Sequence, residues 1–381
     1  MQQKVRIHSL DMIRGIAILC ILFANLPTMT GLDSFNQAGY SGIDKVVRFL
    51  VDLLISSKFY TIFAFLFGVG FYIFMRNTEK KGYPIYKLFS RRLCILLLFG
   101  VIHFIFLWYG DILHAYAIAG FVLLFFYKRF TKLIFIVGCI SLLVSYALHA
   151  ILFIQAGSSI SAVPNYYQYM FTGNTTNHTV NLFTHYSHQV KARLFFLMTQ
   201  EFQQLLIGIP EYIGLFLIGL WAGKKDIFKR VPELIKEIRF LQWSSLCISC
   251  FLSYPIIYYF IKTDVYYSQD IQLWILFGGK MLAIFYICTL LRICENKKYI
   301  EWLHPFMNVG KYALTNYISQ SILTLGILSL YFKDVSHVYY WQLCIFGLLI
   351  IFVQIIFSNI WSKYFRYGPI EWVWRKGIYK K

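Results

Sequence analysis

The stretch Ser9-Leu-Asp-Met-Ile-Arg-Gly-Ile-Ala-Ile-Leu-Cys-Ile-Leu-Phe-Ala-Asn-Leu-Pro27 decides the fold. It is apolar enough to predict a membrane-spanning helix, yet it carries Asp11, Arg14 and Asn25. Ionisable groups at membrane depth usually face a bundle interior or a watery cavity. Asp11 and Arg14 are three residues apart and can pair, and Asn25 returns to nearly the azimuth of Arg14. Two interpretations stay open: an ion pair that locks helices together, or a site polarised along the helix.

The composition excludes a soluble protein. Of 381 residues, 59% are hydrophobic and only 14% are charged, which a soluble domain has no way to bury. The net charge of +19 comes from basic residues in alternate connections, a pattern typical of the cytoplasmic side of a membrane protein and not of a nucleic-acid surface. The eight cysteines lie in or beside apolar spans without the spacing of a disulfide framework or a metal site.

The apolar segments predict an all-α polytopic membrane protein with about ten transmembrane helices. Basic residues in the connections place both termini in the cytoplasm. The expected spans are residues 10–28, 57–76, 92–109, 112–127, 133–154, 201–222, 240–261, 271–292, 311–331 and 339–361.

The chain divides into two helical halves around one long polar segment. The N-terminal half covers residues 1–154, an extracytoplasmic loop covers 155–200, and the C-terminal half covers 201–381 and ends in a cytoplasmic interfacial tail. His185 and His188 in the loop are three residues apart, but without a carboxylate or cysteine partner nearby they indicate a solvated surface, and no metal site is predicted.

A hairpin of two spans carries the clearest candidates for chemistry. His103 lies at membrane depth, where a histidine can exchange a proton near neutral pH or be a satisfied core residue. Asp111 sits at the turn, where a carboxylate either caps the next helix or takes part in catalysis. His114 follows as the next candidate.

Further polar residues interrupt later spans. Glu211 follows Pro210 in the outer half of the span 201–222. Asn316 and Gln320 lie one turn apart in the span 311–331, where they either bond to a neighbouring helix or line a cavity.

Together the motifs resemble the bacterial YeiB-like membrane proteins (domain of unknown function 418). The stretches that carry the resemblance are Leu10-Asp-Met-Ile-Arg-Gly15 through Asn25, Phe63-Ala-Phe-Leu-Phe-Gly-Val-Gly70, Arg91-Arg92 through His103 to Gly110-Asp-Ile-Leu113, Gly214-Leu-Phe-Leu-Ile-Gly219, Ala313-Leu-Thr-Asn-Tyr-Ile-Ser-Gln-Ser321 and Gly368-Pro-Ile-Glu-Trp372.

That family is distantly similar to transmembrane acyltransferases, namely the bacterial type-three enzymes and heparan-alpha-glucosaminide N-acetyltransferase. The resemblance implies an acyltransferase-like N-terminal half, a cytoplasmic acyl-CoA donor and transfer to an acceptor on the far side. In the type-three enzymes an arginine of the first helix is followed eleven residues later by a histidine. Here Arg14 matches but Asn25 takes the second position. An amide is no general base at neutral pH, so His103 is the expected substitute.

The first hypothesis is therefore an acyl-CoA-dependent acyltransferase of the bacterial cytoplasmic membrane. His103 acts as base, Asp111 orients it or holds the acceptor, and Asn25 joins the catalytic group as a polar donor. Asp11 and Arg14 hold the pantetheine end. The remaining substrate- or donor-binding candidates are Arg91, Arg92, Glu211, Thr315, Asn316, Gln320, Glu371 and Arg375.

Acyl-CoA would be a co-substrate, and no cofactor is expected. The expected partners are membrane lipids and a small-molecule, glycan or lipid acceptor, with a homodimer left open. A second hypothesis is a transporter or flippase of a small polar or lipid-linked solute, because buried polar groups also line permeation paths. A third is a sensory or scaffold membrane protein.

Overall fold

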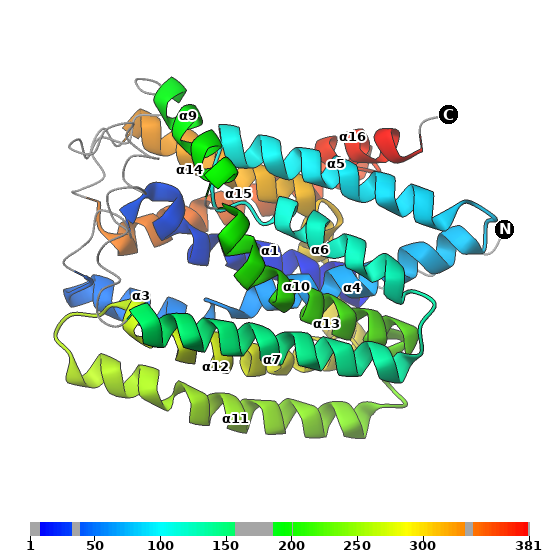
Figure 1. Ribbon diagram of the computed structural model, residues 1–381, viewed down its shortest axis with the longest axis horizontal. Coiled ribbons are helices and arrows are strands. Elements are labelled where there is room, and N and C mark those ends of the chain that lie inside the picture. Colours follow the sequence, from blue (N-terminus) through cyan, green and yellow to red (C-terminus); the bar gives the residue numbers. More distant parts are fainter. Residues whose placement is uncertain (1–7, 33–38, 157–185, 200, 332–337, 380–381) are drawn as a thin grey trace.

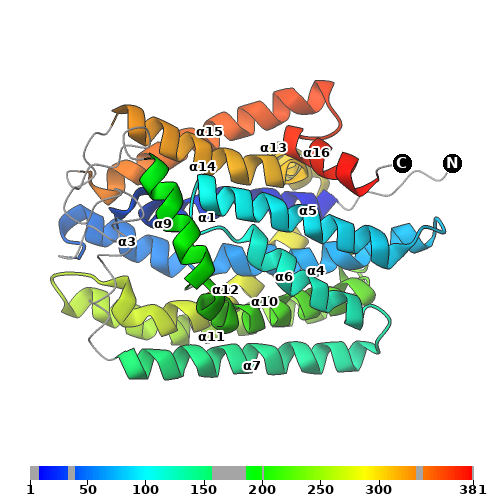
Figure 2. The same cartoon turned by 45° about the horizontal axis from the view of Figure 1, so that its top comes forward.

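The structure is a computed structural model that describes residues 8–32, 39–156, 186–199, 201–331 and 338–379. Across these ranges the regular secondary structure is helical, and the β-type pairing is a single antiparallel bridge between Tyr40 and Tyr266. The long helices run side by side along the longest axis of the molecule, as both views of the bundle show (Figure 1, Figure 2).

The helices follow one another along the chain. They are α1 (His8–Thr30), α3 (Gly42–Leu54), α4 (Lys58–Glu79), α5 (Ile85–Phe106), α6 (Leu113–Phe126), α7 (Thr131–Ala156), α9 (Tyr186–Thr199), α10 (Glu201–Lys224), α11 (Ile235–Lys262), α12 (Gln272–Ile293), α13 (Lys297–Lys311), α14 (Ala313–Tyr331), α15 (Tyr340–Tyr364) and α16 (Pro369–Ile378). Short 3₁₀ turns occupy Ile227–Lys229 and Ser268–Ile271.

Eight helical segments within the described residues are long and apolar enough to cross a membrane. They are His8–Thr30, Gly42–Glu79, Ile85–Phe106, Thr131–Ile154, Gln204–Lys224, Ile235–Lys262, Ser268–Ile293 and Tyr340–Tyr364. The prediction of an all-α polytopic membrane protein is thus confirmed.

The expected count of ten spans is matched only in part. The spans expected at 112–127 and 311–331 correspond to α6 and α14, which have 14 and 19 residues and are not among the eight. The sequence did not predict α13, a helix that precedes α14 and is separated from it at Tyr312. The amphipathic helix α3 occupies Gly42–Leu54, directly before α4.

The two ends of the bundle differ in charge. The α4–α5 and α6–α7 connections and α16 lie at one end, on the right of Figure 1, whereas α3 and α9 lie toward the other. Basic residues gather at the first end, among them Lys80, Lys81, Lys128, Arg129 and Lys376.

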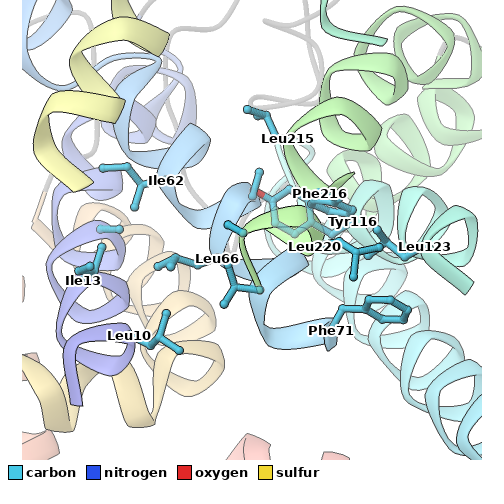
Figure 3. Close-up of a cluster of buried hydrophobic side chains, with 14 of the residues drawn as sticks. Leu10, Ile13, Ile62, Leu66, Phe71, Tyr116, Leu123, Leu215, Phe216 and Leu220 are labelled. Atoms are coloured by element: carbon cyan, nitrogen blue, oxygen red, sulfur yellow. The ribbon is translucent and has the colours of Figure 1, made fainter. Parts of the chain in front are cut away.

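Glycines let the central helices approach until their backbones touch. A Cβ on Gly68 of α4 would lie 2.0 Å from the carbonyl oxygen of Phe216 in α10, and one on Gly219 would lie 2.0 Å from that of Phe65. Around this crossing Leu66, Phe216 and their neighbours form the main apolar core (Figure 3). Gly68 and Gly219 therefore serve the close packing of α4 on α10.

Glycines also let the backbones of α1 and α13 touch. A Cβ on Gly15 would lie 1.8 Å from the carbonyl oxygen of Phe306, and one on Gly310 would lie 1.8 Å from that of Asp11. This contact fixes the N-terminal part of α1, and with it Arg14, against α13.

We expect Gly219→Ala to destabilise the protein, because the added methyl group meets a backbone carbonyl that has little freedom to move. Overpacking of this kind costs about 1–3 kcal/mol. The matched control is Gly208→Ala in the same helix, where the nearest atom to the new Cβ is a Tyr212 ring carbon at 3.8 Å. Thermal unfolding in detergent should show a lower Tm for Gly219→Ala and an equal or higher Tm for Gly208→Ala. Equal Tm values for the two variants would contradict the close packing of α4 on α10.

Candidate functional site

The candidate site is built around one buried carboxylate, that of Asp111. It lies in the turn between α5 and α6, with its side chain out of contact with solvent. One oxygen, Oδ2, is 2.9 Å from His114 Nδ1 and also accepts the backbone N–H of His114 at 2.9 Å. The other, Oδ1, is 3.0 Å from His103 Nδ1, close enough for an ion pair but poorly aligned for a hydrogen bond. Asp111 therefore caps α6 and joins two histidines at once.

Two more side chains extend this group at either end. His103 Nε2 is 2.8 Å from the Ser321 hydroxyl of α14, and His114 Nε2 is 2.9 Å from Oε1 of Glu201 in α10. The result is a continuous chain, Ser321–His103–Asp111–His114–Glu201, which we call the histidine relay. Its members are all buried, and Ser321 has 0% of its surface exposed.

A glycine makes the relay sterically possible. A Cβ on Gly100 of α5 would lie 2.3 Å from the backbone nitrogen of His114 and 2.8 Å from Asp111 Oδ2. The absence of a side chain at Gly100 lets the start of α6 press against α5, which brings both histidines to the same carboxylate.

A cavity of about 230 Å³ leads toward the relay from the basic end of the bundle. Its wall is mostly apolar and comes from α1, α4, α5, α6, α14 and α16, with the ends of α13 and of the α5–α6 turn. Lining residues include Ile18, Ile21, Phe63, Phe67, Leu96, Leu113 and Tyr116.

The mouth of the cavity carries the charged lining residues Arg14, Arg92, Lys311 and Glu371. Arg14 forms the expected ion pair with Asp11, with 3.1 Å between Nη1 and Oδ1. The Arg92 guanidinium lies 4.3 Å from the Trp374 ring centroid, so α16 packs over this cation.

Glu371 belongs to the mouth but serves first as a helix cap. Its Oε1 accepts the backbone N–H groups of Leu314 and Thr315 at 2.8 and 3.0 Å, which satisfies the first turn of α14. Burial raises the pKa of the Glu371 carboxyl, although hydrogen bonds from Thr315 oppose that shift. Thr315 and Glu371, both substrate-binding candidates, therefore bind each other.

The Tyr317 side chain separates the inner end of the cavity from His103. Tyr317 and Ile112 both line the cavity. The Tyr317 hydroxyl accepts the backbone N–H of Ile112 at 3.3 Å, and its ring centroid is 5.3 Å from that of His103. A ligand that enters from the mouth has to move Tyr317 to reach the relay.

Several candidates lie elsewhere. Asn25, Arg91 and Arg375 are not part of the cavity wall. Arg91 donates to the carbonyl oxygen of Ile378, and Arg375 lies over two tyrosine rings of the tail.

Asn316 and Gln320 also take no part in the cavity wall. Asn316 donates to Ser358, and Gln320 donates to Gln354 and to the backbone of Ile18. Of the two interpretations left open for these amides, hydrogen bonding to neighbouring helices is the one observed.

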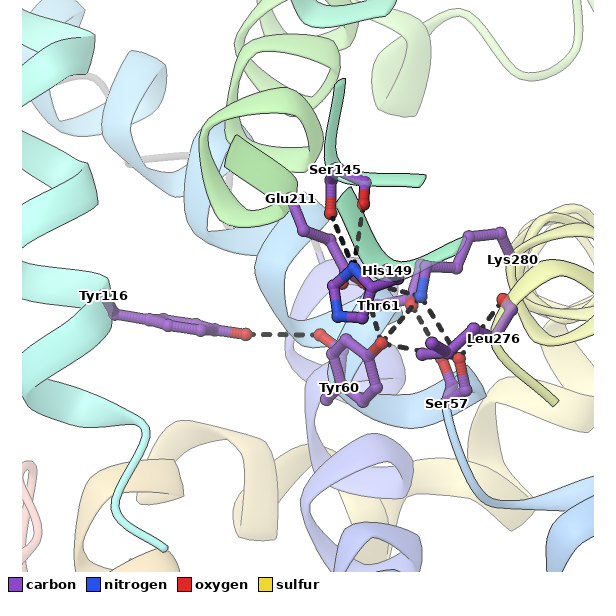
Figure 4. A network of polar contacts seen from close by, with 9 residues as sticks. All are labelled: Ser57, Tyr60, Thr61, Tyr116, Ser145, His149, Glu211, Leu276 and Lys280. Atoms are coloured by element: carbon purple, nitrogen blue, oxygen red, sulfur yellow. Dashed lines mark hydrogen bonds and ion pairs between the residues drawn. The ribbon is translucent and has the colours of Figure 1, made fainter. Parts of the chain in front are cut away.

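Glu211 belongs to a separate polar cluster (Figure 4). Its Oε1 accepts from Tyr60 at 2.7 Å and pairs with Lys280, which also donates to Tyr60 at 2.6 Å and to Ser57 at 3.2 Å. Tyr116 connects this cluster to the cavity wall, because its hydroxyl donates to the Tyr60 carbonyl oxygen.

Sequence reasoning missed Ser321, Glu201 and Tyr317 as site residues. A serine in a transmembrane helix commonly bonds to its own backbone, so Ser321 gave no distinct signal. Of the loop histidines, His185 lies outside the described residues, and His188 lies in α9.

The comparisons with known proteins point to one family. The family described as "Protein of unknown function (DUF418)" matches residues 222–381. The chain is 30% identical to "Uncharacterized protein YxaH" of Bacillus subtilis (strain 168), over 98% of this chain and 94% of that protein. It is 27% identical to "Uncharacterized protein YeiB" of Escherichia coli (strain K12), over 97% and 95%. No solved structure matches the chain. These matches confirm the resemblance drawn from the motifs.

We expect Lys280→Met to destabilise the protein, because it leaves the buried Glu211 carboxylate without its cation. Breaking such a pair from one side costs about 3–5 kcal/mol, whereas replacing both charges is often close to neutral. The double variant Glu211→Gln/Lys280→Met should therefore recover most of the loss in Tm. If the double variant were as unstable as Lys280→Met alone, the cluster would not be a structural ion pair.

Proposed function

This chain belongs to the DUF418 family, and from that premise we propose that it is a membrane acyltransferase. It would move an acyl group from cytoplasmic acyl-CoA to an extracytoplasmic or lipid-linked acceptor. The observation that carries the proposal is the cavity, which joins a cationic mouth to the wall in front of His103 and Asp111.

The lining of the cavity suits an acyl thioester. Arg14, Arg92 and Lys311 at the mouth offer positive charge to the phosphates of a nucleotide carrier. Deeper residues such as Phe67 and Leu96 offer apolar contact to the pantetheine arm and the acyl chain. Asp11 supports the donor site by fixing Arg14.

The histidine relay supplies the chemistry that acyl transfer requires. With its Nδ1 proton toward Asp111, His103 presents an unprotonated Nε2 that can accept a proton from an attacking group. Asp111 is itself held by the N–H groups of His114, which keeps it in place for orienting His103.

We place the protein in a bacterial cytoplasmic membrane, with membrane lipids around it. The bacterial relatives and the eight apolar helices support this location. Ten spans with both termini in the cytoplasm are part of the proposal, with α6 and α14 as the two shorter crossings. The gathering of basic connections at one end supports this orientation.

Transport is the weaker candidate. Its best support is the charged cluster of Glu211 and Lys280 at membrane depth. Both groups are paired within the cluster, and neither lines the cavity. A counterflow assay in liposomes separates the two functions, because a transporter moves its substrate without consuming an acyl donor.

His103→Ala should abolish acyl-donor consumption by the purified protein. The measurement is thiol release from acetyl-, butyryl- and palmitoyl-CoA in detergent, with the Tm recorded in parallel to verify folding. Loss of a general base lowers turnover by about 10²–10⁴-fold. Unchanged turnover in a folded variant would remove His103 from the mechanism, and a wild-type protein inert toward all three donors would contradict acyl transfer.

Filling the cavity should block the donor without touching the relay. Gly70 lines the cavity, and a Cβ there would lie 3.8 Å from the Arg14 guanidinium, so Gly70→Leu projects its side chain into the donor path. The control is Gly326→Leu in α14, where an added Cβ meets no atom of the described structure within 4 Å. We expect Gly70→Leu to raise the KM for acyl-CoA at least tenfold and Gly326→Leu to leave it unchanged. Equal KM values would place the donor elsewhere.

A further inference from the structure

We propose that Ser321 is the nucleophile of this reaction and that the acyl group rests on its hydroxyl between donor and acceptor. The inference builds on the proposed acyl transfer. Ser321 Oγ lies 2.8 Å from His103 Nε2, and His103 Nδ1 lies 3.0 Å from Asp111 Oδ1. A hydroxyl, an imidazole and a carboxylate in this order form the arrangement that activates serine nucleophiles in unrelated folds.

The Ser321 hydroxyl is hydrogen-bonded to the His103 ring. Serines in membrane helices usually bond to the carbonyl four residues earlier. Within the described residues, the Ser321 hydroxyl instead hydrogen-bonds to His103 of another helix, α5. A serine with only a structural role does not need the bond to His103, because a bond to the backbone of its own helix would satisfy its hydroxyl equally well.

The position of Ser321 continues the line of the cavity. Tyr317 lines the inner end, and Ser321 lies one helical turn, about 6 Å, further along the same face of α14. A thioester that displaces Tyr317 therefore meets the Ser321 hydroxyl next.

Two buried polar groups near His103 and Ser321, without a partner among the described residues, suit the oxygen of an acyl group. Trp108 Nε1 is buried without a hydrogen-bond partner among the described residues, and the Trp108 ring lies edge-on to His103 with 6.4 Å between centroids. Thr324 Oγ1 is also buried and unpartnered there, three residues after Ser321 on α14. Buried donors are rarely left unpaired, and an acyl oxyanion would pair them.

The steps balance. In the first, Ser321 Oγ attacks the thioester carbonyl and His103 Nε2 takes the hydroxyl proton. The carbon–sulfur bond then breaks, and the CoA thiolate leaves with that proton as free thiol. In the second, an acceptor hydroxyl or amine attacks the Ser321 ester, His103 takes its proton, and Ser321 Oγ leaves with the proton restored.

The test uses the full-length protein with acyl-CoA and no added acceptor. After an acid quench, peptide mass spectrometry should find the acyl group on Ser321 in the wild type. Ser321→Ala and His103→Ala should carry no label. Ser319→Ala is the matched control on the same helix, since the Ser319 hydroxyl bonds to Asn316 and Gln354 outside the relay. It should be labelled like the wild type.

The outcomes separate the two proposals. Thiol release with label on Ser321 and a burst stoichiometric with the protein supports the inference. Thiol release with the label on another residue, with no label, or with full activity in Ser321→Ala overturns it and leaves acyl transfer standing by direct attack. No thiol release from any acyl-CoA by the wild type overturns acyl transfer, and the Ser321 inference with it.

Discussion

The structure depends above all on the sharing of one buried carboxylate between two histidines. An ionised Asp111 at this depth is tolerable only because N–H groups surround it, since its side chain is out of contact with solvent and the local dielectric is low. Both ring nitrogens of His114 face carboxylate oxygens, those of Asp111 and Glu201, so this ring satisfies both by donating twice and is an imidazolium. The other oxygen of Asp111, Oδ1, faces His103 Nδ1 at 3.0 Å and so holds the orientation of that ring.

This charge pairing also fixes the arrangement of the helices. The relay takes its members from α5, α6, α10 and α14, which are distant in the sequence. The polar contacts hold these helices in register, while glycine contacts set their distances: Gly100 between α5 and α6, and Gly15 with Gly310 between α1 and α13. The cavity is the space that remains where Gly70 and Arg14 face each other without such a contact.

The sequence predicted the elements of this arrangement better than their pairing. Apolar runs and basic connections located the helices because the membrane imposes both patterns. His103 and Asp111 were predicted as candidates because ionisable groups in or beside a membrane span are costly and usually have a function. Asn25 shows what helical periodicity cannot predict. It places Asn25 on the same side of α1 as Arg14, but the cavity wall on α1 ends at Ile21 and Asn25 lies beyond it. Residues three turns apart on one face need not meet the same environment. Ser321 stayed hidden because its partner comes from 218 residues away.

Two of the buried charged clusters within the described residues illustrate how position separates structure from chemistry. Glu211 and Lys280 neutralise each other, and Tyr60 hydrogen-bonds to both, so their charges are used within the cluster. The relay differs in one respect. Its terminal hydroxyl lies one helical turn beyond Tyr317, which lines the cavity, and the Trp108 ring next to His103 has an N–H without a partner among the described residues. A buried donor without a partner, close to space for a ligand, is a group that catalysis can use.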